Sequence, residues 1–204
     1  LLFQDKEPTE PISLEAEEYP QIDVDFDTLR EMNDDVVGWI YIPDTEINYP
    51  VLQGDNNDQY LYRFMNGKYN GAGSIFLDAD VPSDFTGKNN PIYGHNMNDG
   101  SMFAGLMGYK DQEFFDQHPK AYLMTPEKNY VVQMFSGYRT DVKADAWQAN
   151  FSQEAYGQWL ENCVAKSVFT ADVTPNTSDR VLTFSTCTYE TANARFVLHG
   201  ILVE

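Results

Sequence analysis

The decisive stretch of the sequence reads Arg180-Val-Leu-Thr-Phe-Ser-Thr-Cys187, then Thr-Tyr-Glu-Thr-Ala-Asn-Ala, then Arg195-Phe-Val-Leu-His-Gly-Ile-Leu-Val203. Both apolar runs are rich in Val, Leu, Phe and Thr, and each is long enough to form one strand. They predict an antiparallel strand pair joined by a loop of about seven residues. Such a pair brings Cys187, at the end of the first strand, beside Arg195, at the start of the second.

This juxtaposition favours nucleophilic chemistry. A guanidinium held near a thiol stabilises the thiolate, which is the nucleophilic form of cysteine. A nucleophile of this kind needs a partner that moves protons, and the sequence has three histidines. His118 lies in a polar, helix-like stretch and His199 lies inside a predicted strand, so both are expected to have structural roles. His95 follows Gly94 in a Gly- and Asn-rich segment, and we expect it to be the catalytic base.

Four short motifs together resemble those of a known family. They are Tyr93-Gly-His95-Asn-Met97, Asp99-Gly-Ser-Met-Phe103, Ser185-Thr-Cys187 and Arg195. They resemble the His, Cys and Arg motifs of the sortases, and the second motif, with the helix-like segment before the last two strands, resembles class B. The resemblance runs from about Val36 to Val203. It implies a mainly β (α+β) fold, a closed eight-stranded barrel with N-terminal helices and one long helix inserted before the last two strands.

The resemblance also implies a mechanism. Cys187 would attack a carbonyl in the C-terminal sorting signal of a surface protein, and His95 would protonate the departing amine. An amino group of a peptidoglycan precursor or of a pilin lysine would then attack the thioester, which makes the reaction a transpeptidation. Arg195 presents several donors and would hold the substrate carbonyl or the oxyanion. The reaction needs no cofactor.

Further residues are expected to bind the peptide. Two-residue alternation along a strand places Ser185 on the same face as Cys187, and Thr186 belongs to the same motif. Resemblance to class B adds Leu61 and Trp147, although the loop around Trp147 departs from better-known class B sequences.

Length and charge limit the alternatives. The chain has 204 residues, enough for one domain with a sizeable core. Its 13 basic and 32 acidic residues give a net charge of −19, which argues against nucleic acid and against a polybasic contact with lipid. No run reaches the roughly 18 to 20 apolar residues of a membrane span. The resemblance nevertheless implies an N-terminal hydrophobic anchor, absent from this chain, that holds the enzyme at the extracellular face of a Gram-positive membrane.

The pattern of elements predicts a single catalytic domain over residues 23–204. Residues 1–22 form an acidic leader that we expect to be partly disordered or left over from cloning. Strands are predicted at 37–42, 47–52, 74–77, 91–93, 121–125 and 130–138, besides the final pair. Helical turns are predicted at 55–64, 101–109 and 111–118, a short helix at 23–33, a long loop at 139–150 and a long helix at 152–166. About eight short strands at this spacing indicate a barrel or a sandwich.

The second cysteine and the acidic residues have structural interpretations. Cys163 shares one predicted helix face with Phe151, Ala155 and Trp159, so we expect a buried thiol and not a Cys163–Cys187 bridge. One Cys and one His lack the ligand number and spacing of a zinc site. The loop carboxylates lack the spacing of a calcium site; they are Asp78, Asp80 and Asp84. No metal is therefore expected.

Two other functions remain open at this stage. A cysteine peptidase would resolve the same thioester with water, using the same Cys and His. A non-enzymatic, surface-binding β domain is suggested by the acidity and the aromatic content.

Overall fold

The computed structural model describes residue 20, residues 22–187 and residues 193–204, and for Cys187 it describes the backbone alone. The predicted acidic leader at 1–22 lies almost wholly outside the described residues. Most of the predicted loop after Cys187 lies outside them too.

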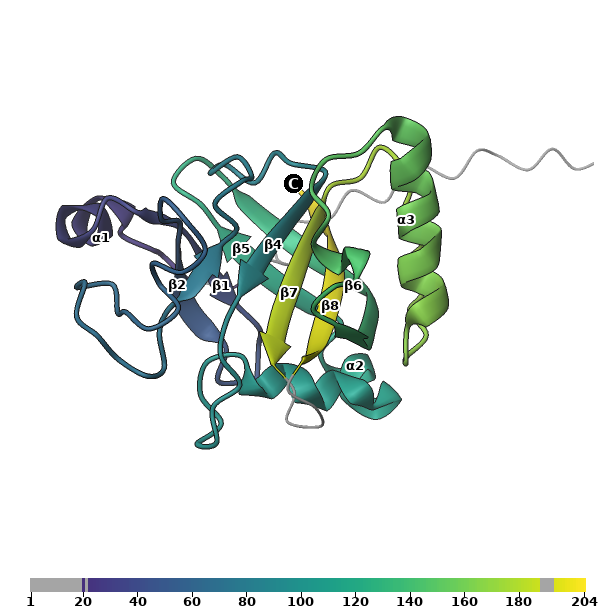
Figure 1. The fold of residues 1–204 in the computed structure, drawn as a ribbon, viewed down its shortest axis with the longest axis horizontal. Coiled ribbons are helices and arrows are strands. Elements are labelled where there is room, and N and C mark those ends of the chain that lie inside the picture. The colour runs from purple at the N-terminus through teal and green to yellow at the C-terminus, as the bar shows by residue number, and fades with distance from the viewer. Residues whose placement is uncertain (1–19, 21, 188–192) are drawn as a thin grey trace, which may run out of the picture.

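Eight strands close into one barrel, in the order β1-β2-β3-β4-β7-β8-β6-β5 (Figure 1). Their bounds are β1 Val36–Tyr41, β2 Asn48–Leu52, β3 Ile75–Leu77, β4 Asn89–Tyr93, β5 Lys120–Met124, β6 Asn129–Asp141, β7 Val181–Cys187 and β8 Ala194–Val203. Two neighbouring pairs are parallel, β2 with β3 and β4 with β7, and the others are antiparallel. The predicted closed barrel is confirmed, and closure gives each of these described strands a neighbour on both sides.

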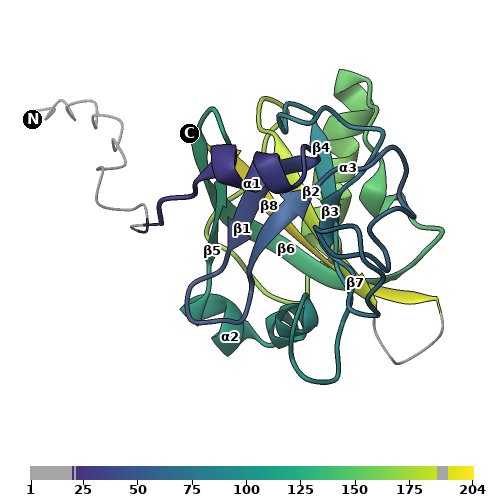
Figure 2. The ribbon, with the colours of Figure 1, turned by 90° about the vertical axis from the view of Figure 1, so that its left-hand side faces the viewer.

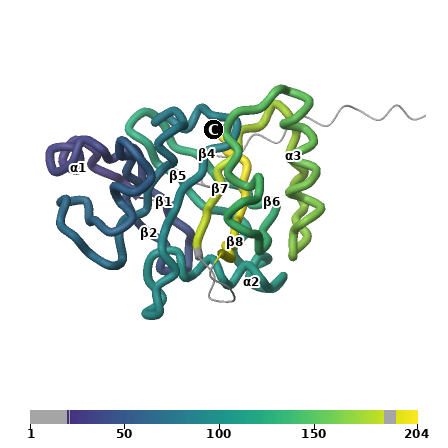
Figure 3. The backbone as a smooth tube through the Cα atoms, in the orientation of Figure 1, coloured from purple at the N-terminus to yellow at the C-terminus, as the bar shows by residue number. Residues whose placement is uncertain are grey.

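The helices cover the outside and one end of this barrel. They are α1 Phe26–Met32, η2 Ala104–Lys110, α2 Gln112–Gln117, η3 Asp145–Trp147 and α3 Gln153–Lys166. Figure 2 shows α1 in front of β1 and β2, and α2 below the barrel. Figure 3 shows α1 and α3 on opposite sides of the barrel. The predicted helix before the last two strands is confirmed as α3.

The barrel interior and the interface under α3 are the main apolar clusters. Alternate strand residues fill the interior, among them Ile40, Val51, Ile92, Phe184 and Leu198, all fully buried. On the outer face of β6 and β8, Trp159, Leu160 and Cys163 of α3 pack against Phe135 and Val197. The burial of these apolar side chains holds the helix on the sheet.

Cys163 is a buried free thiol, as expected. The rest of its predicted helix face is partly wrong, because Ala155 is exposed and Tyr156 is buried. The helix starts at Gln153, with Ser152 as its N-cap, so Phe151 lies before it.

Two other predictions differ from the structure. Residues 55–64 form consecutive turns instead of a helix. The side-chain oxygen of Asn56 accepts hydrogen bonds from the backbone amides of Asp58 and Gln59, and the chain then turns back toward β3. The predicted loop at 139–150 is strand in its first part, because Arg139–Asp141 continues β6 along β8. The longer strand forms because β8 supplies pairing partners to its first residue, Ala194.

No helix in the described part of the chain combines the length and the apolar character that crossing a bilayer requires.

Candidate active site

Three adjacent strands bring the predicted catalytic residues to one end of the barrel. Cys187, the last residue of β7, is the Cα partner of Arg195 in β8. On its other side β7 runs parallel to β4, with Tyr93 opposite Ser185. His95 and Cys187 each follow this last pair by two positions in the sequence. The prediction that Cys187 and Arg195 lie side by side is confirmed at the level of the backbone.

Hydrogen bonds continue the contact between β4 and β7 beyond the last strand residue. The amide of Gly94 donates to the carbonyl of Ser185 at 3.2 Å, and the hydroxyl of Thr186 donates to the carbonyl of Gly94 at 2.8 Å. The carbonyl of His95 in turn accepts from the amide of Phe103 at 2.8 Å. These bonds fix the backbone on both sides of the histidine.

The imidazole of His95 has a defined orientation. Its Nε2 lies 2.6 Å from the carbonyl oxygen of Leu61. Because a carbonyl only accepts, Nε2 carries a proton and donates it. The ring also packs against Tyr62, with 5.3 Å between ring centroids. The histidine is therefore held by the segment between β2 and β3 as well as by its own loop.

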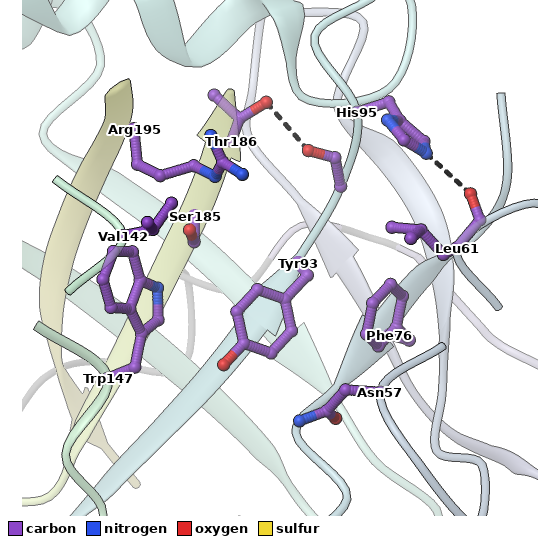
Figure 4. A pocket seen from close by; sticks show the side chains of 11 residues that line it. Asn57, Leu61, Phe76, Tyr93, His95, Val142, Trp147, Ser185, Thr186 and Arg195 are labelled. Atoms are coloured by element: carbon purple, nitrogen blue, oxygen red, sulfur yellow. Dashed lines mark hydrogen bonds between the residues drawn. The ribbon is translucent and has the colours of Figure 1, made fainter. Parts of the chain in front are cut away.

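A cavity of about 440 Å³ opens beside these residues. It is lined by Asn57, Leu61, Phe76, Tyr93, Gly94, His95, Val142, Trp147, Ser185, Thr186 and Arg195. Figure 4 shows Val142 and Trp147 on one side, Leu61 and Phe76 on the other, and Tyr93 between them. This shape, with apolar walls and a few polar groups, is typical of a binding site for an extended peptide or a small ligand.

Some of the polar groups of the cavity lie toward the end of the barrel where β7 stops. Ser185 and Thr186 are almost completely buried, and Arg195 is partly buried. The Nη1 of Arg195 donates to the carbonyl of Ala194 at 3.0 Å. A guanidinium has five N–H donors, so this bond leaves others for a ligand.

The carboxylate of Asp78 holds two residues that line the cavity, Tyr93 and Asn57. The hydroxyl of Tyr93 donates to Oδ2 of Asp78 at 2.7 Å, and Nδ2 of Asn57 donates to the same oxygen at 3.1 Å. Burial and the neighbouring carboxylate both raise the pKa of Tyr93 above its ordinary value. Tyr93 therefore stays neutral at physiological pH, and its hydrogen bond to Asp78 fixes its position in the cavity wall.

Comparison with known proteins agrees with this geometry. The family model described as the Sortase domain matches residues 40–203. The chain belongs to the sortase family. Sortase B of Listeria monocytogenes is 39% identical over 178 residues, covering 86% of this chain and 72% of that protein. The structure of a Staphylococcus aureus sortase B–substrate complex has a TM-score of 0.84 and 34% identity, covering 88% of this chain and 84% of that one. A structure of sortase B complexed with triglycine has a TM-score of 0.83 and 33% identity, covering 88% and 85% of the two chains.

These likenesses identify the sortase as one of class B, a cysteine transpeptidase with the barrel of sortase B structures. The prediction of an enzyme is thereby confirmed. The interpretation as a non-enzymatic surface-binding domain is set aside.

Most of the predicted site residues of this sortase line one cavity. His95, Arg195, Ser185, Thr186, Leu61 and Trp147 all line it. The backbone of Cys187 lies at the same end, and its side chain is outside the described part. The other two histidines have the structural positions expected of them. His118 is the C-cap of α2, and His199 is completely buried in β8.

Several lining residues were not predicted from the sequence. Tyr93 could have been found, because the alternation that pairs Ser185 with Cys187 applies equally to Tyr93 and His95. Val142 was missed because its segment read as a loop. Asn57 and Phe76 come from the segment between β2 and β3 and from β3, and no pattern in the sequence links them to the catalytic motifs.

Proposed function

We propose that this sortase cleaves the C-terminal sorting signal of surface proteins through a thioester on Cys187 and transfers the new C-terminus to an amino group. The observation that carries the proposal is the meeting of His95, Arg195 and the end of β7 at one cavity with apolar walls.

The choice of nucleophile follows from the two cysteines of the chain. Cys163 is 1% exposed, and burial raises the pKa of its thiol to about 12. At neutral pH it is a protonated thiol that no peptide reaches, and the thiolate is the reactive form. Cys187 stands instead at the end of a strand, next to the cavity and paired with an arginine. This contrast supports Cys187 as the nucleophile.

The reaction has two halves. In the first, the sulfur of Cys187 bonds to the scissile carbonyl carbon, the carbon–nitrogen bond breaks, and His95 gives a proton to the leaving amine. In the second, an acceptor amine attacks the thioester carbonyl, the carbon–sulfur bond breaks, and His95 takes the proton that the amine loses. The products are a new amide and the regenerated thiol.

Arg195 suits the role of oxyanion donor. Its guanidinium keeps its charge at any relevant pH, and its planar fork can direct two N–H groups at one oxygen. Its Cα is paired with that of Cys187, so the cation and the attacked carbonyl would be neighbours. Donors directed at a developing negative charge contribute a large share of acyl-transfer catalysis.

The cavity suits an extended peptide with apolar side chains. Leu61 and Phe76 form one wall, and Val142 and Trp147 form the other (Figure 4). Ser185 and Thr186 add hydroxyl groups near the reacting end. We assign the peptide segment before the scissile bond to this cavity.

The acceptor is an amine of a peptidoglycan precursor or of a pilin lysine, and the enzyme acts at the outer surface of a Gram-positive cell. The sortase B that was solved with triglycine supports an amine acceptor, because triglycine is a short peptide with a free amino terminus. Accessibility of the native enzyme to protease added to intact cells tests the location.

A peptide library tests the function. Labelled pentapeptides of varied sequence are incubated with the protein, with and without triglycine, and the products are identified by mass spectrometry. We expect one peptide class to be cleaved, a thioester adduct on Cys187, and a triglycine adduct whenever triglycine is present. Hydrolysis at an equal rate in both reactions, with no adduct, would indicate the peptidase instead. Cleavage retained in Cys187→Ala would refute the nucleophile.

A further inference from the structure

A buried asparagine holds the backbone on both sides of Trp147. Asn89 lies on β4 and is completely buried. Its Nδ2 donates to the carbonyl of Ala146 at 3.1 Å and to the carbonyl of Gln148 at 3.0 Å. These two residues flank Trp147 in the chain, so both amide hydrogens of one side chain bind the segment that carries the cavity wall.

Trp147 has no comparable bond of its own. Its indole nitrogen is inaccessible to solvent and has no hydrogen-bond partner among the described residues. The side chain also packs against the apolar cluster beneath α3. The hydrogen bonds that hold the indole in place therefore act through its backbone.

A series of hydrogen bonds that ends on Oδ1 of Asn89 supports the orientation of its side chain. The Thr183 hydroxyl donates to Oδ1 of Asn89 at 2.6 Å. Since that hydroxyl has one proton, its 2.8 Å contact with Nδ1 of His199 must be donated by the imidazole. Burial lowers the pKa of His199 to about 3, so the ring is neutral and its Nε2 accepts from Tyr138 at 3.1 Å. The Cys163 thiol then donates to the Tyr138 oxygen across 3.6 Å.

The hydrogen bonds of Asn89 allow only one orientation of its side-chain carboxamide. Turning Asn89 over would place its oxygen against the carbonyl oxygens of Ala146 and Gln148, neither of which can donate a hydrogen bond. Breaking buried hydrogen bonds of this kind leaves unpaired polar groups, which is unfavourable. From the other side, Nε1 of Trp159 in α3 donates to the carbonyl of Asp145 at 2.9 Å. The η3 segment is thus held between β4 and α3.

We propose that Asn89 is a positioning residue for peptide binding, because it fixes the wall formed by Trp147 in the geometry that receives the peptide. The inference rests on the proposed function, which assigns the peptide to this cavity. Asn89 touches no reacting atom. Its loss should therefore weaken peptide capture more than it slows chemistry.

The neighbouring residue is a matched control. Asn90 is also on β4 and completely buried, and its Nδ2 also donates to two carbonyls, those of Gly87 and Val181 at 2.8 and 3.0 Å. Those carbonyls belong to the turn before β4 and to β7. Asn90→Ala therefore removes equivalent bonds without touching the η3 segment.

The kinetic test uses the pentapeptide that the wild-type enzyme cleaves fastest. We expect Asn89→Ala to raise KM about tenfold with kcat within about twofold, since the two lost bonds act on ground-state and transition-state binding alike. Asn90→Ala should lower the thermal midpoint comparably and leave KM within about twofold. Equal KM values in the two variants would overturn the proposal.

A second measurement needs no substrate. The chain has three tryptophans, and each gives one indole ¹H–¹⁵N resonance in a labelled sample. The Trp147 signal is assigned by its loss in Trp147→Phe. We expect it to shift or broaden in Asn89→Ala and to stay in place in Asn90→Ala. An unchanged Trp147 signal in a folded Asn89→Ala protein overturns the proposal. If the wild-type enzyme cleaves no pentapeptide, the proposed function fails while this measurement still decides the role of Asn89.

A milder pair of variants covers the case in which Asn89→Ala does not fold. Thr183→Val removes the hydroxyl that orients Asn89, whereas Thr183→Ser keeps it. We expect Thr183→Val to move the Trp147 resonance and to raise KM about threefold, and Thr183→Ser to restore both. An identical Trp147 signal in the two proteins counts against the proposal.

Discussion

The hydroxyl of Thr186 donates a 2.8 Å hydrogen bond to the carbonyl of Gly94, and so joins the residue before Cys187 to the residue before His95. The ladder between β4 and β7 ends at the pair of Tyr93 and Ser185, so it includes neither His95 nor Cys187. A misplacement of about 1 Å at a reacting centre can reduce the rate on the order of a hundredfold. We therefore expect this bond to help align the proposed nucleophile, Cys187, with the proposed proton donor, His95.

Thr186→Val tests that contribution. The substitution keeps the shape of the side chain and removes the donor, which leaves the partly buried Gly94 carbonyl without this partner. We expect kcat to fall about tenfold, as measured with the fastest pentapeptide, and Thr186→Ser to restore most of the rate. Equal rates in the Val and Ser variants would show that the backbone alone aligns the two residues.

Arg195→Lys separates charge from geometry. Lysine keeps the positive charge and lacks the planar fork, so we expect kcat to fall at least about tenfold with little change in the thermal midpoint. Arg180→Lys is the control, because Arg180 forms an ion pair with the exposed Glu204 at the other end of β7. A near-normal rate in Arg195→Lys would remove the fork from the mechanism.

Gly73→Ala should disturb His95 from a distance. Gly73 has a φ of +60°, and an added Cβ would lie 2.4 Å from the carbonyl oxygen of Leu61, the acceptor for Nε2 of His95. Gly67 has a φ of +77° with nothing within 4 Å of an added Cβ, so Gly67→Ala reports backbone strain alone. We expect Gly67→Ala to cost about 1 kcal/mol of unfolding free energy with normal kcat, and Gly73→Ala to cost more and to lower kcat. Indistinguishable turnover in the two variants would contradict this.

His199 should make stability depend on pH. Burial lowers its pKa from 6.5 to about 3. At pH values between these two, the unfolded chain therefore binds a proton on His199 that the folded chain does not bind. Stability is therefore full above about pH 6.5 and falls on acidification toward pH 3, with a slope of at most about 1.4 kcal/mol per pH unit.

The comparison protein for this measurement is His199→Gln. Other titrating groups are common to both proteins, so the difference between their unfolding free energies isolates the histidine. Urea melts at several pH values between 4.5 and 7 give that difference, and we expect it to shrink as the pH falls. A constant difference would mean that His199 does not titrate on unfolding in this range.

Local patterns in the sequence predicted about eight strands in a barrel or a sandwich, and the resemblance to the sortases selected the closed barrel. Two-residue alternation marked most strands, and strand pairing next to a short loop placed Cys187 beside Arg195. Part of the cavity wall was harder to predict, because Phe76 and Val142 line the same cavity as His95 only in the closed barrel. The extension of β6 through Asp141 depends on its partner β8, and no local preference shows it.

The buried series of hydrogen bonds through His199 also could not be predicted from the sequence. A histidine in an alternating strand indicated a structural role. Its partners, however, come from β4, β6, β7 and α3 and are distant along the chain. Such contacts follow from the tertiary fold.

The parallel pairing of β4 with β7 has a consequence for the life of the enzyme before it is folded. Thr186 and Gly94 are separated by 92 positions along the chain, and contacts between such distant segments require the large intervening loop to close. A nascent or partly folded chain therefore holds its thiol and its imidazole apart. We therefore expect activity to appear only when the barrel closes, because closure brings these two segments together.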